Sequence, residues 1–136
     1  MSMDKPRLGG RKTTTGERQA LGGFGERTAR AHLEAKGYQI IDRNFRTREC
    51  EIDIVARDGD VVVFVEVRTR RGAYPGMAAL SITRGKARRI LHAVERYAEA
   101  HPDVADSPQR IDAVAIELDA RGKLLGVDHI EDAVRP

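Results

Sequence analysis

The sequence is poor in residues that cross-link small secreted proteins or bind zinc. Its single cysteine, Cys50, cannot form an internal disulfide. Its four histidines show no metal-ligand spacing, which argues against a zinc site. No apolar run approaches the roughly 18 residues of a membrane-spanning helix, and the residues after Met1 lack the apolar core of a signal peptide. These absences predict a cytoplasmic protein without a membrane partner.

Aromatic residues are also scarce, with three phenylalanines, three tyrosines and no tryptophan. Phe24, Phe45 and Phe64 fall at apolar positions of the sequence pattern, so we expect them in the core rather than in platforms that stack on bases. A chain of 136 residues is long enough for one domain that buries roughly two thirds of its unfolded surface. We therefore expect a single folded domain.

The net charge of +3 is concentrated at the N-terminus. Residues 1–20 contain five basic and two acidic side chains and show no apolar periodicity, so we expect a disordered basic tail. Such a tail is either a solvated terminus without a role or a loose arm that contacts phosphate. Residues 21–136 carry no net charge, so any basic surface there must come from local clustering.

The apolar pattern of residues 21–136 predicts an α/β domain. A helix over 21–36 would end at Gly37, since glycine is a common C-cap residue. A second helix would run from a cap at Ser81 or Thr83 to about residue 100. The pattern further predicts a strand over 38–46, a hairpin over 51–68, a loop over 69–76, and strands over 110–118 and 124–130. The order α-β-β-β-α-β-β favours one mixed five-stranded sheet flanked by helices.

The predicted hairpin places two carboxylates in an otherwise apolar pair of strands. A two-residue turn at 58–59 would leave Asp53 diagonal to Glu66, whereas a turn at 59–60 would set the two directly opposite each other. Either register brings both side chains to one face, about 5–8 Å apart at the backbone. Like charges this close need a positive partner between them.

Two interpretations explain this acid pair. In the first, a divalent cation binds Asp53 and Glu66, with Glu26 from the flank of the first helix as a further oxygen ligand. In the second, the acids join Arg68 and Arg110 in an ordinary ion-pair network on a solvated face of the sheet. The residue pattern leaves both interpretations open.

A cluster of basic residues begins the second predicted helix. Arg84, Lys86 and Arg88 fall in its first turns, where free backbone N–H groups and the helix dipole also favour phosphate. With Arg70 before them, they form a candidate nucleic-acid surface that carries no base information. A solvated helix face explains the same residues.

Several motifs follow one another along the chain in a recognisable order. They are Gly25-Glu26, Leu33-Glu34-Ala35-Lys36-Gly37-Tyr38, Arg43-Asn44, Glu51-Ile52-Asp53-Ile54-Val55, Val63-Phe64-Val65-Glu66-Val67-Arg68-Thr69-Arg70, Lys86, and Arg110-Ile111-Asp112-Ala113-Val114. In this order the chain resembles the bacterial YraN family, which is similar to restriction-endonuclease-like (PD-D/E-x-K) nucleases and to archaeal Holliday-junction resolvases. The resemblance spans residues 22–134 and implies that 21–136 form a nuclease-like domain with a restriction-endonuclease-like core.

The resemblance also implies a catalytic site. Glu26 corresponds to the helix-one acid of resolvase-like nucleases, and Asp53 corresponds to their first strand acid. Glu66 corresponds to the acid of the Glu-x-Lys motif, and Arg68 stands where that motif has lysine. A guanidinium does not deprotonate near neutral pH, so Arg68 would orient water or stabilise a phosphorane but would not act as a general base.

The implied activity is cleavage of structured or damaged DNA by a nuclease that uses Mg²⁺ or Mn²⁺ held by Asp53, Glu66 and Glu26. The lysine to arginine change leaves a second hypothesis, a nucleic-acid-binding module of the same fold without turnover. A third is a protein-interaction subunit that uses the fold as a scaffold. The sequence leaves homodimerisation open.

Overall fold

The computed structural model describes residues 15–72 and 82–135. Its elements are α1 (Thr15–Ala35), β1 (Gln39–Arg46), β2 (Glu51–Asp58), β3 (Val61–Arg71), α2 (Arg84–Ala100), α3 (Pro102–Ala105), β4 (Gln109–Leu118) and β5 (Leu124–Val134). The strands form one sheet in the order β1-β2-β3-β4-β5. Strands β3 and β4 run parallel, and the other neighbours run antiparallel. The predicted α/β architecture and element order are confirmed, with the short helix α3 added.

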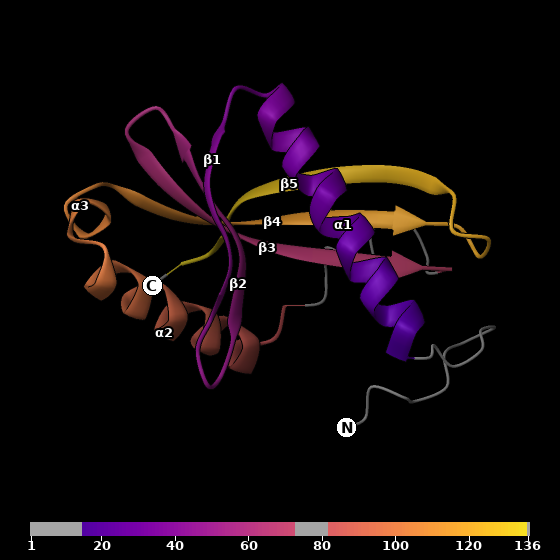
Figure 1. Ribbon diagram of the computed structural model, residues 1–136, viewed down its shortest axis with the longest axis horizontal. Helices are drawn as coiled ribbons and strands as arrows, with labels where there is room; N and C mark the ends of the chain where they lie inside the picture. Colours follow the sequence, from indigo (N-terminus) through magenta and orange to yellow (C-terminus); the bar gives the residue numbers. More distant parts are fainter. Residues whose placement is uncertain (1–14, 73–81, 136) are drawn as a thin grey trace.

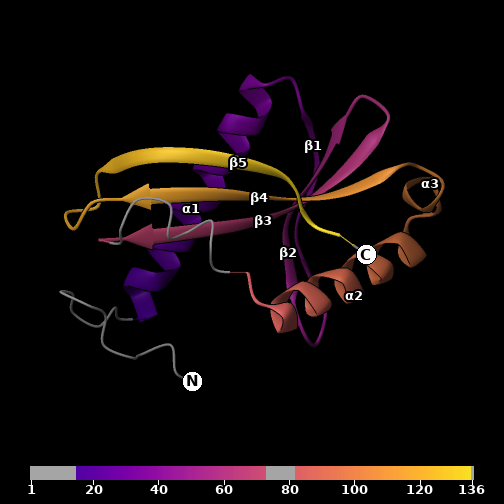
Figure 2. The same cartoon turned by 180° about the vertical axis from the view of Figure 1, so that it is seen from behind.

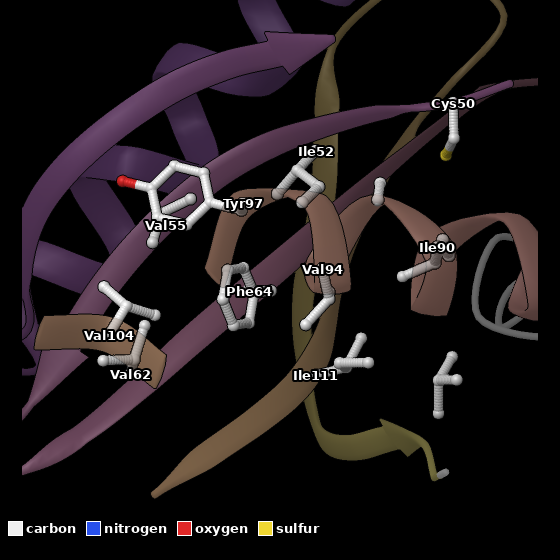
Figure 3. Close-up of a cluster of buried hydrophobic side chains, with 12 residues drawn as sticks. Cys50, Ile52, Val55, Val62, Phe64, Ile90, Val94, Tyr97, Val104 and Ile111 are labelled. Carbon is white, nitrogen blue, oxygen red and sulfur yellow. The ribbon is translucent and has the colours of Figure 1, made fainter. Parts of the chain in front are cut away.

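The two long helices cover opposite faces of the sheet. Helix α1 lies in front of β3, β4 and β5 in Figure 1 and behind them in Figure 2, while α2 lies behind β2 in the first view and in front of it in the second. Each helix buries its own apolar cluster against the strands. The α1 cluster includes Ala29, Leu33, Ile54, Val63, Val65, Val114 and Ile116. The α2 cluster, shown in Figure 3, includes Val55, Val62, Phe64, Ile90, Val94, Tyr97 and Ile111.

Helix α1 packs closely on β3 and ends as predicted. A Cβ atom added at Gly25 would overlap Oγ1 of Thr69, so the close approach requires glycine at this position. At the other end, Gly37 takes a φ of +93°. The N–H of Gly37 bonds to the carbonyl of Glu34 and that of Tyr38 to the carbonyl of Leu33, which satisfies the last carbonyls of the helix.

Two predicted boundaries differ from the structure. Helix α1 begins at Thr15 rather than residue 21, because the stretch Glu-Arg-Gln-Ala over 17–20 consists of good helix formers. The structure therefore shows helix where part of the disordered tail was predicted, and residues 1–14 of that tail lie outside the described residues. Strand β3 continues to Arg71, so the predicted loop over 69–76 begins too early, and its part from residue 73 onward also lies outside them.

The hairpin between β2 and β3 adopts the second of the two predicted registers. Asp58 pairs with Val61, so the turn consists of Gly59 and Asp60. Gly59 takes a φ of +61°, a conformation that glycine adopts without strain. The paired region ends at Ile54 and Val65, so Asp53 and Glu66 come next along the same register and lie on one face of the hairpin. Within the described ranges, none of the helices is long and apolar enough to cross a bilayer.

Candidate functional site

Asp53 lies where strand β2 separates from β3. The last ladder pair joins Ile54 to Val65. Immediately beyond it, Oδ2 of Asp53 accepts a hydrogen bond from the backbone N–H of Val67 at 2.7 Å. The carboxylate thus satisfies a backbone donor that the ladder no longer pairs, and the bond fixes the side chain beside β3.

Glu66 on β3 is the second acid of the site, and only 5% of it is exposed. Its Oε2 atom lies 3.2 Å from Nη1 of Arg68, which follows two residues later on the same face of β3. The same oxygen lies 3.5 Å from Nζ of Lys86, which α2 contributes. Two cationic groups from different elements therefore share one carboxylate oxygen.

Burial and the proximity of the two carboxylates disfavour the charged form of Asp53. Burial and the neighbouring Glu66 carboxylate raise the pKa of Asp53 from 3.8 to about 7, while the Val67 N–H and Lys86 act in the opposite direction. The surroundings of Asp53 therefore disfavour its charged form, although Arg68 and Lys86 both contact Glu66. A divalent cation fits this donor set, because Mg²⁺ is commonly held by one or two carboxylates together with water and substrate phosphate.

Glu26 does not join this pair, in contrast to the prediction. Its Oε2 atom lies 2.9 Å from Nε of Arg30 and 3.6 Å from Nη1 of Arg43 on β1. No group of three or more histidine, cysteine, aspartate or glutamate side chains in the described ranges is placed to hold a metal. The structure thus places Glu26 apart from Asp53 and Glu66, and metal binding by these acids stays a prediction. Arg30, four residues after Glu26 on one helix, was the sequence signal for this alternative.

The basic residues of the predicted nucleic-acid surface differ in exposure and in what they contact. Lys86 reaches Glu66, and its side chain is 27% exposed. Arg84 and Arg88 are exposed on α2. Arg70 is partly buried on β3, where its Nη1 lies 3.5 Å from the carbonyl oxygen of Thr69. Their contact with nucleic acid stays a prediction, whereas the proximity of Lys86 to the acid pair was not predicted.

A second acidic cluster, which the sequence reasoning missed, surrounds Asp112 on β4. Its Oδ1 accepts hydrogen bonds from Nε of Arg110 at 2.8 Å and from the backbone N–H of Asp132 at 2.9 Å. Its Oδ2 accepts from Nη2 of Arg110 at 3.0 Å and lies 2.7 Å from Nε2 of His129. Nδ1 of His129 lies 2.8 Å from Nζ of Lys36, which can only donate, so Nε2 carries the hydrogen that bonds to Asp112.

Asp112 is fully buried, yet it is ionised at neutral pH. Burial alone would raise its pKa, but the hydrogen bonds from Arg110, Asp132 and His129 outweigh burial and lower the pKa below 3.8. Arg110 was predicted in an ion-pair network with Asp53 and Glu66, whereas the structure pairs it with Asp112 two residues later on the same strand face. Nothing in the sequence pattern indicated His129, because its alignment with β4 depends on irregular pairing with β5.

Fold and site together define an α/β protein of the mixed-sheet class, with a carboxylate pair at the point where β2 leaves β3. The chain belongs to the family described as "Uncharacterised protein family UPF0102", whose model matches residues 25–116. This membership confirms the predicted YraN-like family. The matched span contains both acids, Arg68 and Lys86.

Relatives match over nearly their whole length. The UPF0102 protein of Roseiflexus castenholzii is 47% identical over 121 residues, which cover 88% of this chain and 97% of the relative. The UPF0102 protein of Frankia casuarinae is 42% identical over 116 residues, covering 85% of this chain and 97% of the relative. Among solved structures, Pyrococcus furiosus SfsA in complex with Ca²⁺ matches with 16% identity and a TM-score of 0.38, over 97% of this chain and 76% of that chain.

Proposed function

We propose that the protein is a metal-dependent endonuclease that hydrolyses phosphodiester bonds in structured or damaged DNA, with Mg²⁺ or Mn²⁺ as cofactor. One observation carries the proposal. Asp53 and Glu66 lie on one face where β2 leaves β3, with Arg68 and Lys86 on Glu66, and burial together with the Glu66 carboxylate raises the pKa of Asp53 to about 7. Perturbation of this kind is typical of functional sites, since structural acids are usually neutralised by their neighbours.

The chemistry that this site supports is addition of water to phosphorus. Asp53 and Glu66 would hold the cation, which lowers the pKa of a bound water and offsets charge in the transition state. The water oxygen bonds to phosphorus, and the bond from phosphorus to one sugar oxygen breaks, leaving its electron pair on that oxygen. The sugar oxygen takes up one proton while the water gives one to solvent, so that one water is consumed. Arg68 supplies a fixed positive charge beside the phosphate.

DNA would reach the site along the basic residues of α2 and β3. The guanidinium groups of Arg84, Arg88 and Arg70 suit the phosphate backbone, and such contacts position a substrate without reading its sequence. Recognition would then depend on the shape of the DNA rather than on its bases.

Two observations favour a second candidate function, nucleic-acid binding without turnover. Arg68 replaces the lysine of the Glu-x-Lys motif, and Glu26 is bound by Arg30 and Arg43 instead of completing the acid set. A protein of this kind would bind DNA with the same surface and the same salt dependence. Only an assay of cleavage separates the two functions.

The test is incubation of linear, flapped, nicked and four-way DNA with Mg²⁺, Mn²⁺ or EDTA. We expect cleavage with either metal, none with EDTA, and a loss of about 10³-fold or more for Asp53→Asn and for Glu66→Gln. Asp60→Asn, an exposed aspartate in the turn of the same hairpin, is the matched control and should cleave normally. Cleavage that survives both site variants would overturn the proposal.

The same DNA panel separates the alternatives if no cleavage occurs. Binding that weakens steeply with salt would support the binding module, because each phosphate contact releases counterions. An absence of salt-dependent binding would support the protein-interaction subunit instead.

A further inference from the structure

The first turn of α2 brings one basic side chain to the acid pair and leaves its neighbours outside. Nζ of Lys86 lies 3.5 Å from Oε2 of Glu66, whereas Arg84 and Arg88 are exposed. The start of the helix is fixed by Thr83, whose Oγ1 accepts a hydrogen bond from the Lys86 N–H at 3.1 Å. The cap therefore holds the backbone from which Lys86 reaches the site.

A count of charges explains why the site would need this lysine as well as Arg68. The two acids contribute two negative charges, a divalent cation offsets them, and the phosphodiester adds one negative charge. Addition of hydroxide to phosphorus raises the charge on the phosphate by one more unit in the transition state. Arg68 alone would balance the bound substrate, and a second cation is needed to balance the transition state.

We infer that Lys86 is a catalytic residue of this site and not part of the DNA-binding surface. Its ammonium contacts a non-bridging oxygen of the scissile phosphate and stabilises the charge that develops as water adds. The Glu-x-Lys resemblance would supply the lysine from β3, next to its glutamate. Here β3 supplies Arg68 and α2 supplies the lysine. The role is electrostatic, involves no proton transfer by Lys86, and rests on the proposed nuclease function.

Kinetics and binding distinguish this role from a backbone contact. We expect Lys86→Gln to slow the single-turnover rate at saturating protein about 100-fold, because the lost charge acts in the transition state. Its dissociation constant for the same DNA in EDTA should change less than about threefold. Lys86→Arg should recover most of the rate because it keeps the charge.

Arg84→Gln and Arg88→Gln are comparison variants from the same helix. Each should weaken DNA binding and reduce the slope of log K against log salt by about 0.9. Arg96→Gln, at an exposed arginine of α2 outside the candidate DNA-binding surface, is the matched control and should leave both the rate and the binding unchanged. The variants thus distinguish a catalytic role of Lys86 from DNA binding by Arg84 and Arg88.

A third readout needs no catalysis. Calorimetric titration with Mn²⁺ in the absence of DNA should show tighter binding to Lys86→Gln than to wild type, by several-fold, because a positive charge beside Glu66 has been removed. Arg84→Gln should bind Mn²⁺ as wild type does.

The outcomes separate this inference from the proposed function. A wild-type rate for Lys86→Gln together with weaker DNA binding would overturn the inference and leave the nuclease proposal standing. Equal rate losses in Lys86→Gln and Lys86→Arg would overturn the role of charge. A wild-type protein that cleaves no DNA with either metal would overturn both, and unchanged Mn²⁺ affinity in Lys86→Gln would show that Lys86 is not coupled to the acid pair.

Discussion

Two buried acidic sites lie on the same sheet, and the fold shifts the pKa values of their aspartates in opposite directions. The carboxylate of Asp112 receives hydrogen bonds from two arginine nitrogens, a backbone N–H and a histidine, and its pKa is lowered. The carboxylate of Asp53 receives one backbone N–H and faces Glu66, and its pKa is raised to about 7.

The difference teaches which buried acid to regard as functional. Asp112 is fully buried and Glu66 is only 5% exposed, so burial alone does not distinguish the two clusters. What separates the clusters is the direction of the pKa shift. Hydrogen bonds outweigh burial at Asp112, whereas burial and the Glu66 carboxylate outweigh the Val67 N–H and Lys86 at Asp53. Asp112 is complete within the fold and stabilises it. Asp53 and Glu66 instead lie with the cations Arg68 and Lys86, and the proposed metal would be a further positive partner.

The largest change in the free energy of unfolding should come from removing the carboxylate of Asp112. Asp112→Ala leaves the guanidinium of Arg110 and the ring of His129 without their shared partner, so we expect the free energy of unfolding to fall by about 3–5 kcal/mol. Urea denaturation at pH 7 measures the loss. Asp128→Ala, at an exposed aspartate of β5, is the control and should change stability by less than about 0.5 kcal/mol. A loss below about 1 kcal/mol for Asp112→Ala would refute its structural role.

Replacing Asp53 in protein kept free of metal should raise the free energy of unfolding, whereas replacing Asp112 lowers it. The pKa of Asp53 is raised on folding, so its contribution to stability is fully present below pH 3.8 and is lost as the pH rises through about 7. At 1.36 kcal/mol per pKa unit the loss is at most about 4 kcal/mol, and less for a partly exposed carboxyl. Asp53→Asn should therefore be more stable than wild type at pH 8 in EDTA.

Urea midpoints at pH 4, 6 and 8 test this expectation. The advantage of Asp53→Asn should shrink toward pH 4, and added Mg²⁺ should stabilise wild type but not the variant at pH 8. Asp60→Asn should follow the wild-type profile because its side chain is exposed. If the urea midpoints of Asp53→Asn and wild type changed with pH in parallel, the ionisation of Asp53 would not destabilise the fold.

The acid pair was predictable from the sequence because short-range rules determine it. Strand alternation has a period of two, and a two-residue turn leaves few registers, so Asp53 and Glu66 had to share a face. The helices and the element order followed from apolar periodicity and from caps such as Thr83 and Gly37.

Long-range contacts were less predictable. A helical wheel places Glu26 on the flank of α1, but it does not show that β1 presents Arg43 there. The contact of Lys86 with Glu66 depends on how α2 packs on the sheet, which local patterns do not determine. One register irregularity lies between the turn at Gly122 and the pair of His129 with Val114, so counting residues from that turn would misplace His129.

The smallest effect should come from the outermost donor of the Asp112 cluster. Lys36 is exposed at the end of α1, and Lys36→Met removes only its hydrogen bond to Nδ1 of His129. We expect a loss of about 0.5–1 kcal/mol by urea denaturation, because solvent can replace an exposed donor. Lys123→Met, at another exposed lysine, is the control and should lose less. A loss above about 2 kcal/mol would mean that Lys36, and not only Arg110 and His129, is needed to stabilise the buried Asp112 carboxylate.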